Sequence, residues 1–426
     1  MTYAETLDFL YNRLAAFHRI GNAAYKPGLD TSLALSHAFG DPHAGLRCIH
    51  VGGTNGKGST AHTVAAILSA AGYKTGLYTS PHLLDFAERI RIDGAPVPHS
   101  YVVDFVERFH NMHCNCDPSF FEFATVMAFD YFATENVDFA VIEVGLGGRL
   151  DSTNIITPLV AAVTNISMDH TAILGGTLAE IAAEKAGIFK HGVPAIVGES
   201  VPETMPVFTR RAAEVGTEVV FADKAGEIVD YMLRPDSIEY ETRTLGSLYG
   251  ELCGDCQVKN TATVLEIVKA LRAQGVVIPD EAVRKGFSKV CELTGLAGRW
   301  MTVSGSPITI CDTGHNPGAW QYLGPRLAAI PGHKHIVLGF VGDKDIDHIL
   351  DYLPADAHYY FVQPSTPRAA KACDVAAKAR ERGLLGLSYN TVAEGYNAAH
   401  AAVTQYGGMI YVGGSTFVVA DFLALR

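Results

Sequence analysis

The chain has 426 residues, of which 48% are hydrophobic and 18% charged, and its 33 Lys plus Arg against 45 Asp plus Glu give a net charge of −12. At about 150 residues per domain this length predicts two or three domains, and the apolar fraction excludes a disordered chain. The acidic balance argues against non-specific binding to nucleic acid or anionic membranes, and no apolar run is long enough for a membrane span. We therefore expect a cytoplasmic, multidomain, monomeric protein whose partners are small molecules.

The first half of the sequence alternates between strand and helix patterns. The N-terminus has helical spacing at Leu7, Leu10, Tyr11, Leu14 and Phe17, with charges between them, which predicts a folded helix and not a signal peptide. Short apolar runs that end in polar residues follow, separated by helical patterns such as 61–71. These runs cover residues 46–51, 75–78, 139–144, 159–165 and 193–197. The alternation predicts a mostly parallel sheet covered on both faces.

A second set of apolar runs follows the glycine-containing segment 294–299, which we expect to link two domains. These runs cover residues 308–311, 336–340, 359–362 and 409–412. The sequence therefore predicts an α/β protein with a larger domain over 1–297 and a smaller Rossmann-like α/β domain over 298–426. Ligands of open parallel sheets bind beyond the carboxyl ends of the strands, so we expect the chemistry at the ends of these runs.

The first strand run leads into the glycine-rich segment Gly53–Thr60, which a helix follows. Glycine permits the tight turn that aims backbone N–H groups at phosphate, and the helix N-terminus adds partial positive charge. Lys57 is expected to reach the outer phosphates and Ser59 to ligate magnesium. The spacing departs from the standard P-loop pattern, because the first glycine is two residues too close and Gly58 separates the lysine from the serine. A simple glycine-rich turn is the alternative, but the strand before it and the helix after it favour a phosphate loop.

Further residues suited to cations stand at strand ends. Glu143 closes one apolar run, and Asp169 and His170 follow the next. Each alone is typical of a structural ion pair or hydrogen bond, but together beside a phosphate loop they predict a nucleotide–magnesium site. Lys185 lies near the end of a predicted helix and cannot bind Mg²⁺ as an ammonium, so it is either a surface charge or a lysine modified to a carbamate.

The eight cysteines are expected to be free thiols. Two local groups, Cys253-x-x-Cys256 and the segment His113–Cys116, supply only part of a tetrahedral zinc shell, and neither is followed by a matching pair.

These segments together resemble the folylpolyglutamate synthase/dihydrofolate synthase family of Mur-type ATP-dependent amide ligases. The most specific shared motifs are EVGLGGRLDSTN (143–154) and YTSPHL (78–83). The others follow in order along nearly the whole chain: GTNGKGS (53–59), FFEF (120–123), TNISMDH (164–170), EKAGIFK (184–190), GRW (298–300), DTGHNPGA (312–319), GDKDI (342–346), PRA (367–369) and GGSTFVVAD (413–421). The resemblance implies a P-loop, Mur-ligase-like central domain and a smaller Rossmann-like C-terminal domain.

The resemblance also implies the reaction. The carboxylate of dihydropteroate, the γ-carboxylate of a reduced folate, or both would be joined to L-glutamate through an acyl phosphate, with release of ADP and phosphate, in folate biosynthesis and polyglutamylation. Phosphoryl transfer mainly needs positioning and charge neutralisation, which Lys57, the loop amides and two Mg²⁺ ions would supply. A monovalent cation is a further candidate cofactor.

The resemblance assigns roles to individual residues. The catalytic residues would be Lys57, His170 and Lys185. The ATP-binding residues would be Thr54, Asn55, Gly56, Lys57, Gly58, Ser59, Asn260, Arg299 and Asp312. The metal ligands would be Ser59, Ser80, Glu143, His170 and Lys185, the last as a carbamate. The pterin- or folate-binding residues would be Phe120, Phe121, Glu122, Phe123, Leu150, Asp151 and Ser152, with the segment Tyr25–Asp30 nearby. The glutamate-binding residues would be His315 and Ser415. The phenylalanine-rich stretch is equally typical of a helix in a hydrophobic core.

Two alternatives stay open at this point. Another Mur-type ligase, acting on a cell-wall precursor, would share the loop and the metal residues, but only about fifty residues precede the loop, too few for an additional domain of usual size. A P-loop ATPase that acts as a switch would not need the polar strand-end loops of a second α/β domain.

Overall fold

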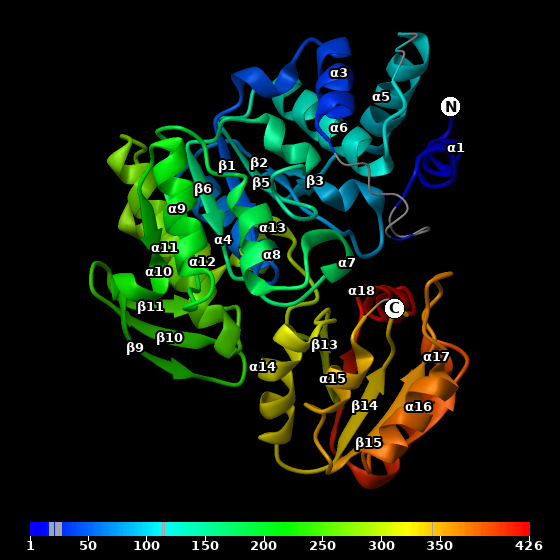
Figure 1. Ribbon diagram of the computed structural model, residues 1–426. Helices are drawn as coiled ribbons and strands as arrows, with labels where there is room; N and C mark the ends of the chain where they lie inside the picture. The colour runs from blue at the N-terminus through cyan, green and yellow to red at the C-terminus, as the bar shows by residue number, and fades with distance from the viewer. Residues whose placement is uncertain (17–20, 22–27, 113, 115, 343) are drawn as a thin grey trace. The chain divides into compact units, whose positions relative to one another are not determined.

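The computed structural model describes residues 1–16, 21, 28–112, 114, 116–342 and 344–426. The chain forms two compact units, Met1–Leu296 and Ala297–Arg426, a division one residue before the predicted boundary. Each unit is an α/β structure, as the sequence predicts (Figure 1). Among the described helices, none is long and apolar enough to cross a membrane.

The first unit is built on an eight-stranded sheet in the order β4-β3-β2-β5-β1-β6-β7-β8. Its parallel strands are β1 (Cys48–Gly52), β2 (Thr75–Tyr78), β5 (Phe139–Glu143), β6 (Val160–Val163), β7 (Ala195–Val197) and β8 (Val219–Phe221). Two antiparallel strands extend one edge, β3 (Ile90–Ile92) and β4 (Ala95–Pro96). All five strands that the sequence predicts in this unit are present, whereas the short strands β3, β4 and β8 near the edges were missed.

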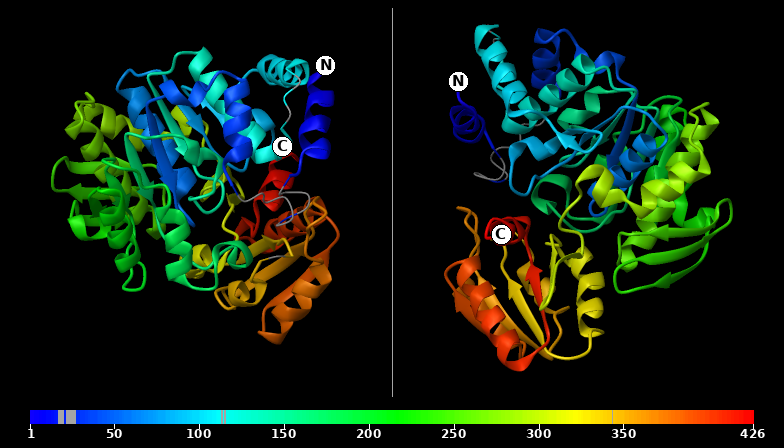
Figure 2. Two further views of the ribbon diagram at one scale, coloured as in Figure 1. Left: turned by 45° about the horizontal axis from the view of Figure 1, so that its top comes forward. Right: turned by 180° about the vertical axis from the view of Figure 1, so that it is seen from behind.

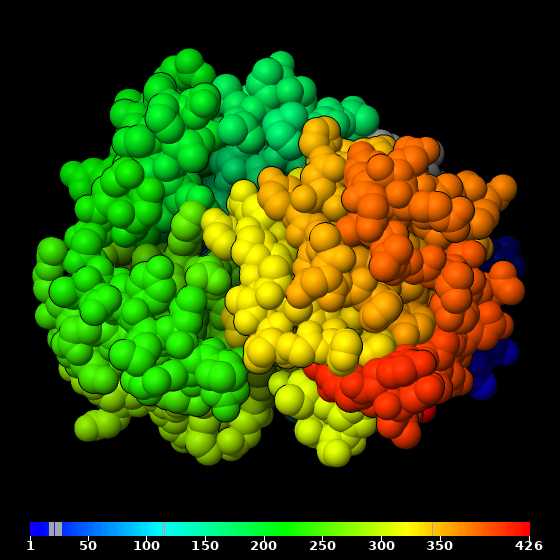
Figure 3. Space-filling model, turned by 90° about the horizontal axis from the view of Figure 1, so that it is seen from below, coloured from blue at the N-terminus to red at the C-terminus, as the bar shows by residue number. Residues whose placement is uncertain are grey.

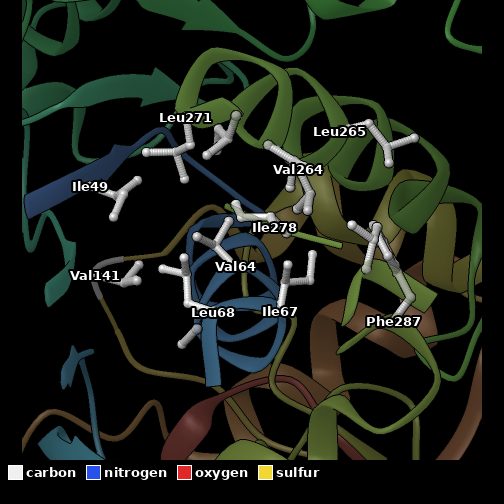
Figure 4. Close-up of a cluster of buried hydrophobic side chains, with 14 of the residues drawn as sticks. Ile49, Val64, Ile67, Leu68, Val141, Val264, Leu265, Leu271, Ile278 and Phe287 are labelled. Carbon is white, nitrogen blue, oxygen red and sulfur yellow. The ribbon is translucent and has the colours of Figure 1, made fainter. Parts of the chain in front are cut away.

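One face of this sheet is covered by the helices α4 (Lys57–Ala70), α11 (Asp255–Ala273) and α12 (Asp280–Ser288). Figure 4 shows Val64 and Leu68 of α4 on the side of Ile49 and Val141 of the sheet, Ile67 toward Phe287 of α12, and apolar side chains of α11 on another side. Because α4 is covered by the sheet and by other helices, nearly all of its residues are buried. This packing fixes the N-terminus of α4, where the glycine-rich loop ends.

The opposite face is covered by a second group of helices, which includes α1 (Tyr3–Asp8), α3 (Asp30–Ala38), α5 (His99–Asn111), α6 (Phe120–Thr134), α8 (Leu178–Ala186) and α9 (Met205–Val215). The predicted N-terminal helix is present as α1 and continues into a π-helical turn, η1 (Phe9–Arg13). Phe17, also part of that prediction, lies outside the described residues. Successive residues of the central strands contact these two groups in turn, as expected for a sheet buried on both faces.

A small antiparallel sheet follows the main sheet along the sequence, and the sequence analysis did not predict it. Its strands are β9 (Ile228–Leu233), β10 (Ile238–Thr242) and β11 (Gly246–Gly250). Short helices among the described residues of this unit include α7 (Thr171–Leu174), α10 (Ala222–Ala225) and α13 (Val290–Thr294), and the 3-10 turns η3 (Pro42–Gly45) and η4 (Phe86–Arg89).

The second unit has a six-stranded sheet in the order β12-β13-β17-β14-β15-β16. The strands are β12 (Met301–Gly305), β13 (Ile308–Asp312), β14 (Lys334–Leu338), β15 (Ala357–Val362), β16 (Leu385–Tyr389) and β17 (Met409–Gly413). The helices are α14 (Pro317–Ala328), α15 (Ile346–Leu350), α16 (Ala372–Glu381), α17 (Val392–Tyr406) and α18 (Thr416–Leu423). They lie on both faces of the sheet (Figure 2), and the unit, yellow to red in Figure 3, packs as one continuous body. The sequence predicts the four central strands and misses the edge strands β12 and β16.

Candidate active site

The segment between β1 and α4 turns tightly at two glycines. Gly53 has a φ of +135° and Gly56 a φ of +82°, conformations that residues with a side chain rarely adopt. A Cβ atom on Gly53 would lie 1.9 Å from the hydroxyl of Thr164, so the loop is pressed against the end of β6. The Lys57 amine folds back and donates to the carbonyls of Gly53 and Thr54, both at 3.1 Å. A glycine turn at the N-terminus of a long helix, with a lysine amine beside it, is suited to phosphate binding.

Residues that follow β6 hold this loop from outside. The N–H groups of Thr54 and Asn55 donate to Asn165, the first to its carbonyl at 2.9 Å and the second to its side-chain oxygen at 2.8 Å. The Thr164 hydroxyl donates to the Asn55 carbonyl at 2.5 Å. Ser167 donates its N–H to the Thr54 hydroxyl at 3.1 Å and accepts from that hydroxyl at 3.3 Å. The sequence prediction did not select these three residues, although polar residues directly after a strand next to β1 were the available signal.

Helix α11 packs against the loop on another side. A Cβ atom on Gly56 would lie 2.2 Å from the side-chain oxygen of Asn260. The Asn260 amide donates to the Gln257 side-chain oxygen at 2.8 Å, and the Gln257 amide donates to the Ser59 hydroxyl at 3.3 Å. Asn260, predicted to bind the nucleotide, thus lies against the phosphate loop, and Gln257 is a neighbour that the sequence prediction missed.

Glu143 and Ser80 meet at the ends of adjacent strands. Because β2 and β5 are parallel neighbours, the residues that follow them lie at one edge of the sheet. Glu143 is only 4% exposed, and its carboxylate accepts the Ser80 N–H at 3.0 Å. A buried carboxylate is costly unless hydrogen bonds or a cation stabilise it, so this position favours cation binding.

Asp169 and His170 follow β6 and precede the short helix α7. His170 has a φ of +50°, and its N–H donates to the Asp169 carboxylate at 2.9 Å. The imidazole Nε2 lies 3.8 Å from the same carboxylate, and both side chains are largely buried. The two residues therefore form one local unit at the edge of the sheet that carries the phosphate loop.

Lys185 points into the protein and not into solvent. It is 4% exposed, and its amine donates at 2.9 Å to the Gly53 carbonyl, which also accepts from Lys57. Burial lowers the pKa of Lys185 to about 7, and the Lys57 cation acts in the same direction, whereas Asp169 and Asp151 oppose the shift. The structure thus removes the alternative of a surface charge for Lys185.

The loop after β5 is organised by Asp151. This buried carboxylate accepts the N–H of Leu146 at 2.8 Å, the N–H of Thr153 at 3.0 Å and the Thr153 hydroxyl at 2.5 Å. Burial raises the pKa of Asp151, and these hydrogen bonds oppose the shift. Leu150 is partly exposed, and Ser152 is buried at the start of the 3-10 helix η5 (Ser152–Ile155).

Two of the four residues on α6 that are predicted to contact a pterin, Glu122 and Phe123, are buried parts of the helix and its packing. The Glu122 carboxylate accepts the Ser119 N–H at 2.7 Å, and the Ser119 hydroxyl accepts the Glu122 N–H at 3.3 Å, which is a capping box at the start of α6. Phe123 is fully buried, and its ring lies 5.1 Å from that of Phe105 and 5.0 Å from that of Phe109. The alternative of a helix in the hydrophobic core therefore describes the surroundings of Phe123.

The other two phenylalanines of this stretch belong to the same hydrophobic cluster as Phe123: Phe120 is buried in it and Phe121 packs against it. Phe120 is buried, and the guanidinium of Arg89 lies over its ring, 5.0 Å from the centroid. Phe121 is partly exposed, and its ring centroid is 6.0 Å from that of Tyr78 at the end of β2.

In the second unit, Asp312 organises the turn at the end of β13. Its buried carboxylate accepts the N–H groups of Trp300 and Gly314, both at 2.7 Å. Burial raises the pKa of Asp312, and the Arg299 guanidinium opposes the shift. Arg299 also donates to the Thr313 hydroxyl. The two predicted nucleotide residues of this unit therefore lie in one hydrogen-bonded turn.

His315 and Ser415 follow two parallel strands that are neighbours, β13 and β17, and so lie at the same edge of the second sheet. The Nδ1 atom of His315 is 3.0 Å from the Thr313 carbonyl. Ser415 is the N-cap of α18, and its hydroxyl accepts the Val418 N–H at 3.2 Å.

Some predicted features lie partly or wholly elsewhere. Tyr25, Lys26 and Pro27 of the segment Tyr25–Asp30 lie outside the described residues, as do His113 and Asn115 of one cysteine group. All eight cysteines are free thiols, as predicted. Within the described part of the chain, no group of three or more His, Cys, Asp or Glu side chains is arranged to hold a metal.

Comparison with protein families identifies the class of enzyme. Residues 51–265 match the Mur ligase middle domain, and residues 298–416 match the Mur ligase, glutamate ligase domain. The class is therefore that of ATP-dependent ligases with a Mur-type α/β fold.

The most similar curated relatives and solved structures narrow this class. The chain is 33% identical to folylpolyglutamate synthase of Lacticaseibacillus casei, over 87% of each chain. It is 37% identical to dihydrofolate synthase/folylpolyglutamate synthase of Escherichia coli K12, over 82% of this chain and 80% of the relative. The structure of E. coli FolC in complex with DHPP and ADP matches with a TM-score of 0.85 and 33% identity, over 100% of this chain and 97% of the other. Mycobacterium tuberculosis folylpolyglutamate synthase complexed with ADP matches with a TM-score of 0.87 and 30% identity, over 99% and 98%. The chain belongs to the folylpolyglutamate synthase/dihydrofolate synthase family.

Proposed function

We propose that this enzyme joins L-glutamate to the carboxylate of dihydropteroate, to the γ-carboxylate of a reduced folate, or to both. The observation that carries the proposal is the glycine-rich loop with two amines, the partly buried one of Lys57 and the buried one of Lys185, on the single carbonyl of Gly53. The relatives support the choice of substrates, because one solved structure contains DHPP and ADP and another contains Mn, AMPPNP and L-glutamate.

The reaction needs activation of a carboxylate, which an amine does not attack directly. One carboxylate oxygen attacks the γ-phosphorus of ATP, the bond to the β-phosphate oxygen breaks, and ADP leaves. The glutamate amine then attacks the acyl phosphate, loses a proton, and expels inorganic phosphate through a tetrahedral intermediate. Transfer of a phosphoryl group depends on positioning and on neutralising its charge. We assign these tasks to Lys57 and to the loop residues Thr54, Asn55, Gly56, Gly58 and Ser59.

Mg²⁺ fits the residues at this edge of the first sheet. The ion is usually bound by one or two carboxylates, hydroxyls, waters and the phosphates of the substrate. The buried Glu143 carboxylate and the hydroxyl of Ser59, at the start of α4, are oxygen donors of this kind. We propose that two Mg²⁺ ions are held by Ser59, Ser80, Glu143, His170 and Lys185, the last as a carbamate. When bound, the metal neutralises phosphate charge.

A carbamate on Lys185 agrees with the position of this lysine. The neutral amine attacks the carbon of CO₂, an N–C bond forms, and one proton leaves, so that a cation becomes an oxygen ligand. A buried amine beside a second cation is more readily neutral than an exposed one, and burial with Lys57 lowers the pKa of Lys185 to about 7. We expect ¹³C-labelled bicarbonate to give one carbamate NMR signal in the enzyme, which Lys185→Ala abolishes and Lys190→Ala keeps. A signal that persists in Lys185→Ala would show that another amine is modified.

The remaining assignments follow the same proposal. Asn260, Arg299 and Asp312 bind the nucleotide, and His315 and Ser415 bind the incoming glutamate. The surface for the pterin or folate is formed by Phe120, Phe121, Glu122, Phe123, Leu150, Asp151 and Ser152, among which Phe121 and Leu150 are partly exposed. A monovalent cation, a monomeric state and a cytoplasmic location stay predictions of the sequence.

Product mass tests the proposed function. The purified chain is incubated with MgATP and L-glutamate, with dihydropteroate in one reaction and tetrahydrofolate in another, and ADP is measured alongside. We expect a product heavier by one glutamyl unit; a gain in both reactions identifies a bifunctional enzyme, and a gain in one identifies a single activity. ATP hydrolysis with no such product would contradict the proposal and favour an ATPase switch. Glutamate joined only to a cell-wall precursor would favour a different Mur-type ligase.

A further inference from the structure

A histidine lies in the middle of the central strand β1. His50 is fully buried, and its Nε2 atom is 2.8 Å from the hydroxyl of Thr153 in η5. Its Nδ1 atom is buried and has no hydrogen-bond partner within the described residues. An unpaired buried acceptor costs stability, which an aliphatic side chain at this position would avoid. The histidine is therefore not explained by packing alone.

The direction of the hydrogen bonds in this cluster follows from the groups involved. The Thr153 hydroxyl has one hydrogen, and it donates at 2.5 Å to the Asp151 carboxylate, which when ionised can only accept. The hydroxyl must then accept from His50, so that Nε2 carries the histidine proton. Burial lowers the pKa of His50 to about 3, and the nearby Lys190 cation acts in the same direction, so the ring is neutral. A single chain of hydrogen bonds therefore runs from His50 through Thr153 to Asp151.

These hydrogen bonds connect segments that belong to different parts of the site. His50 lies two residues before the end of β1, which leads into the phosphate loop. The second carboxylate oxygen of Asp151 accepts the Leu146 N–H at 2.8 Å, which fixes the loop after β5. The same loop is tied to the helix of Lys185, because the Arg149 N–H donates to the Glu184 carbonyl at 2.8 Å. The orientation of the Asp151 carboxylate is thus set from the strand beneath it.

We propose that His50 and Thr153 are positioning residues that orient the Asp151 carboxylate for recognition of the N–H groups of the substrate's pterin ring. The inference rests on the proposed function, in which Asp151 contacts the pterin. Neither His50 nor Thr153 touches the substrate; each acts through Asp151. A carboxylate that is held in one rotamer by charge-assisted hydrogen bonds binds a donor without first losing side-chain freedom.

Thr153→Val tests this proposal, because valine keeps the shape of threonine and removes the hydroxyl. We expect the KM for dihydropteroate or tetrahydrofolate to rise about tenfold, as for loss of a hydrogen bond to a charged group, while kcat and the KM for ATP change less than about twofold. Thr153→Ser, which keeps the hydroxyl, is the matched control and is expected to restore the KM of the unmodified enzyme.

The same experiment is repeated at His50, the other end of the series of hydrogen bonds. His50→Gln retains an N–H donor and is expected to keep the KM for the pterin substrate, whereas His50→Leu is expected to behave as Thr153→Val. If thermal unfolding shows that a variant of one residue does not fold, the two variants of the other residue still test the positioning role.

Three outcomes would overturn the inference, and they are distinguishable. Equal KM values for Thr153→Val and Thr153→Ser would show that the hydroxyl has no positioning role. A rise in the KM for ATP as large as that for the pterin substrate would show a general structural effect. Asp151→Asn, measured in parallel, must raise the KM for the pterin substrate; if it does not, Asp151 makes no such contact. If the unmodified enzyme forms no glutamylated product, the proposed function itself fails.

Discussion

The phosphate loop of the first unit and the Asp312 turn of the second unit are both polar turns at the carboxyl ends of parallel strands, but they are held in different ways. The phosphate loop receives hydrogen bonds or close packing from three other segments: the residues after β6, helix α8 and helix α11. The Asp312 turn is held by two segments of its own unit. Its carboxylate accepts the N–H groups of Trp300 and Gly314, Thr313 donates to the Gly298 carbonyl, and the Trp320 side chain of α14 donates to the Gly314 carbonyl at 3.2 Å.

From this difference we propose a division of tasks between the units. Groups that stabilise a transferring phosphoryl are most effective when they are fixed before the reaction, and the many braces of the phosphate loop provide that. A turn that fewer segments hold can adjust more easily when a ligand binds. We therefore expect damage to the phosphate loop to lower turnover, and damage to the Asp312 turn to weaken ATP binding.

The largest effect is expected for Lys57→Ala. The Lys57 amine lies against the carbonyls of Gly53 and Thr54, and in the proposed mechanism its loss removes a positive charge that neutralises the transferring phosphoryl group. We expect kcat for ADP formation to fall on the order of 10³-fold, the scale seen when a cation is removed from such sites, with little change in thermal stability. Lys74→Ala, a partly exposed lysine of the same unit paired with Glu135, is the control. Activity within tenfold of the unmodified enzyme would contradict the assignment.

The next effect in size is expected for Asp312→Ala, which leaves the N–H groups of Trp300 and Gly314 without their acceptor. We expect the KM for ATP to rise by roughly ten- to a hundredfold, the range for buried hydrogen bonds to a charged group, with a smaller change in kcat. Asp374→Ala, at an exposed position on α16, serves as the control. A fall in kcat at unchanged KM would break the comparison between the two turns.

A smaller loss of turnover is expected for Asn165→Ala. This change removes the side-chain acceptor of the Asn55 N–H but keeps the backbone carbonyl that holds Thr54. Loss of one neutral hydrogen bond predicts a fall in kcat of about tenfold or less, with the KM for ATP nearly constant. Steady-state kinetics at saturating glutamate measure both, and Asn390→Ala, exposed in the second unit, is compared in parallel. An effect on KM alone would mean that this brace serves binding and not turnover.

The last prediction concerns stability and pH and not turnover, at the strand that leads into the glycine-rich loop. Burial lowers the pKa of His50 from 6.5 to about 3, so below pH 6.5 the unfolded chain takes up a proton that the folded chain does not. The free energy of unfolding should therefore fall as the pH falls through this window, by about 2 kcal/mol between pH 7 and pH 5 from this group. Urea unfolding of His50→Gln should lack this part of the loss. An identical pH dependence in both proteins would show that His50 does not titrate as buried.

Features that depend on a few consecutive residues were predicted correctly from the sequence. The glycine turn before Lys57 and all nine predicted strands are present, because backbone conformation and the apolar pattern of a strand are local properties. Edge strands were missed: β16 is largely exposed and therefore lacks a continuous apolar run. The small sheet β9–β11 also lay outside the prediction.

What the sequence by itself determined about this protein is its class of fold, the glycine turn before Lys57 and the motifs that identify its family. Only the tertiary structure decided which side chains reach that loop. Asn165 and Gln257 become part of it because β6 and α11 pack beside β1 and α4, and Lys185 becomes a buried amine and not a surface charge because α8 carries it to the Gly53 carbonyl. On one helix, α6, the structure likewise separates Phe123 in the core from the partly exposed Phe121. The physical reason is that burial and hydrogen bonding between distant segments depend on how helices pack against the sheet, which no local pattern of residues contains.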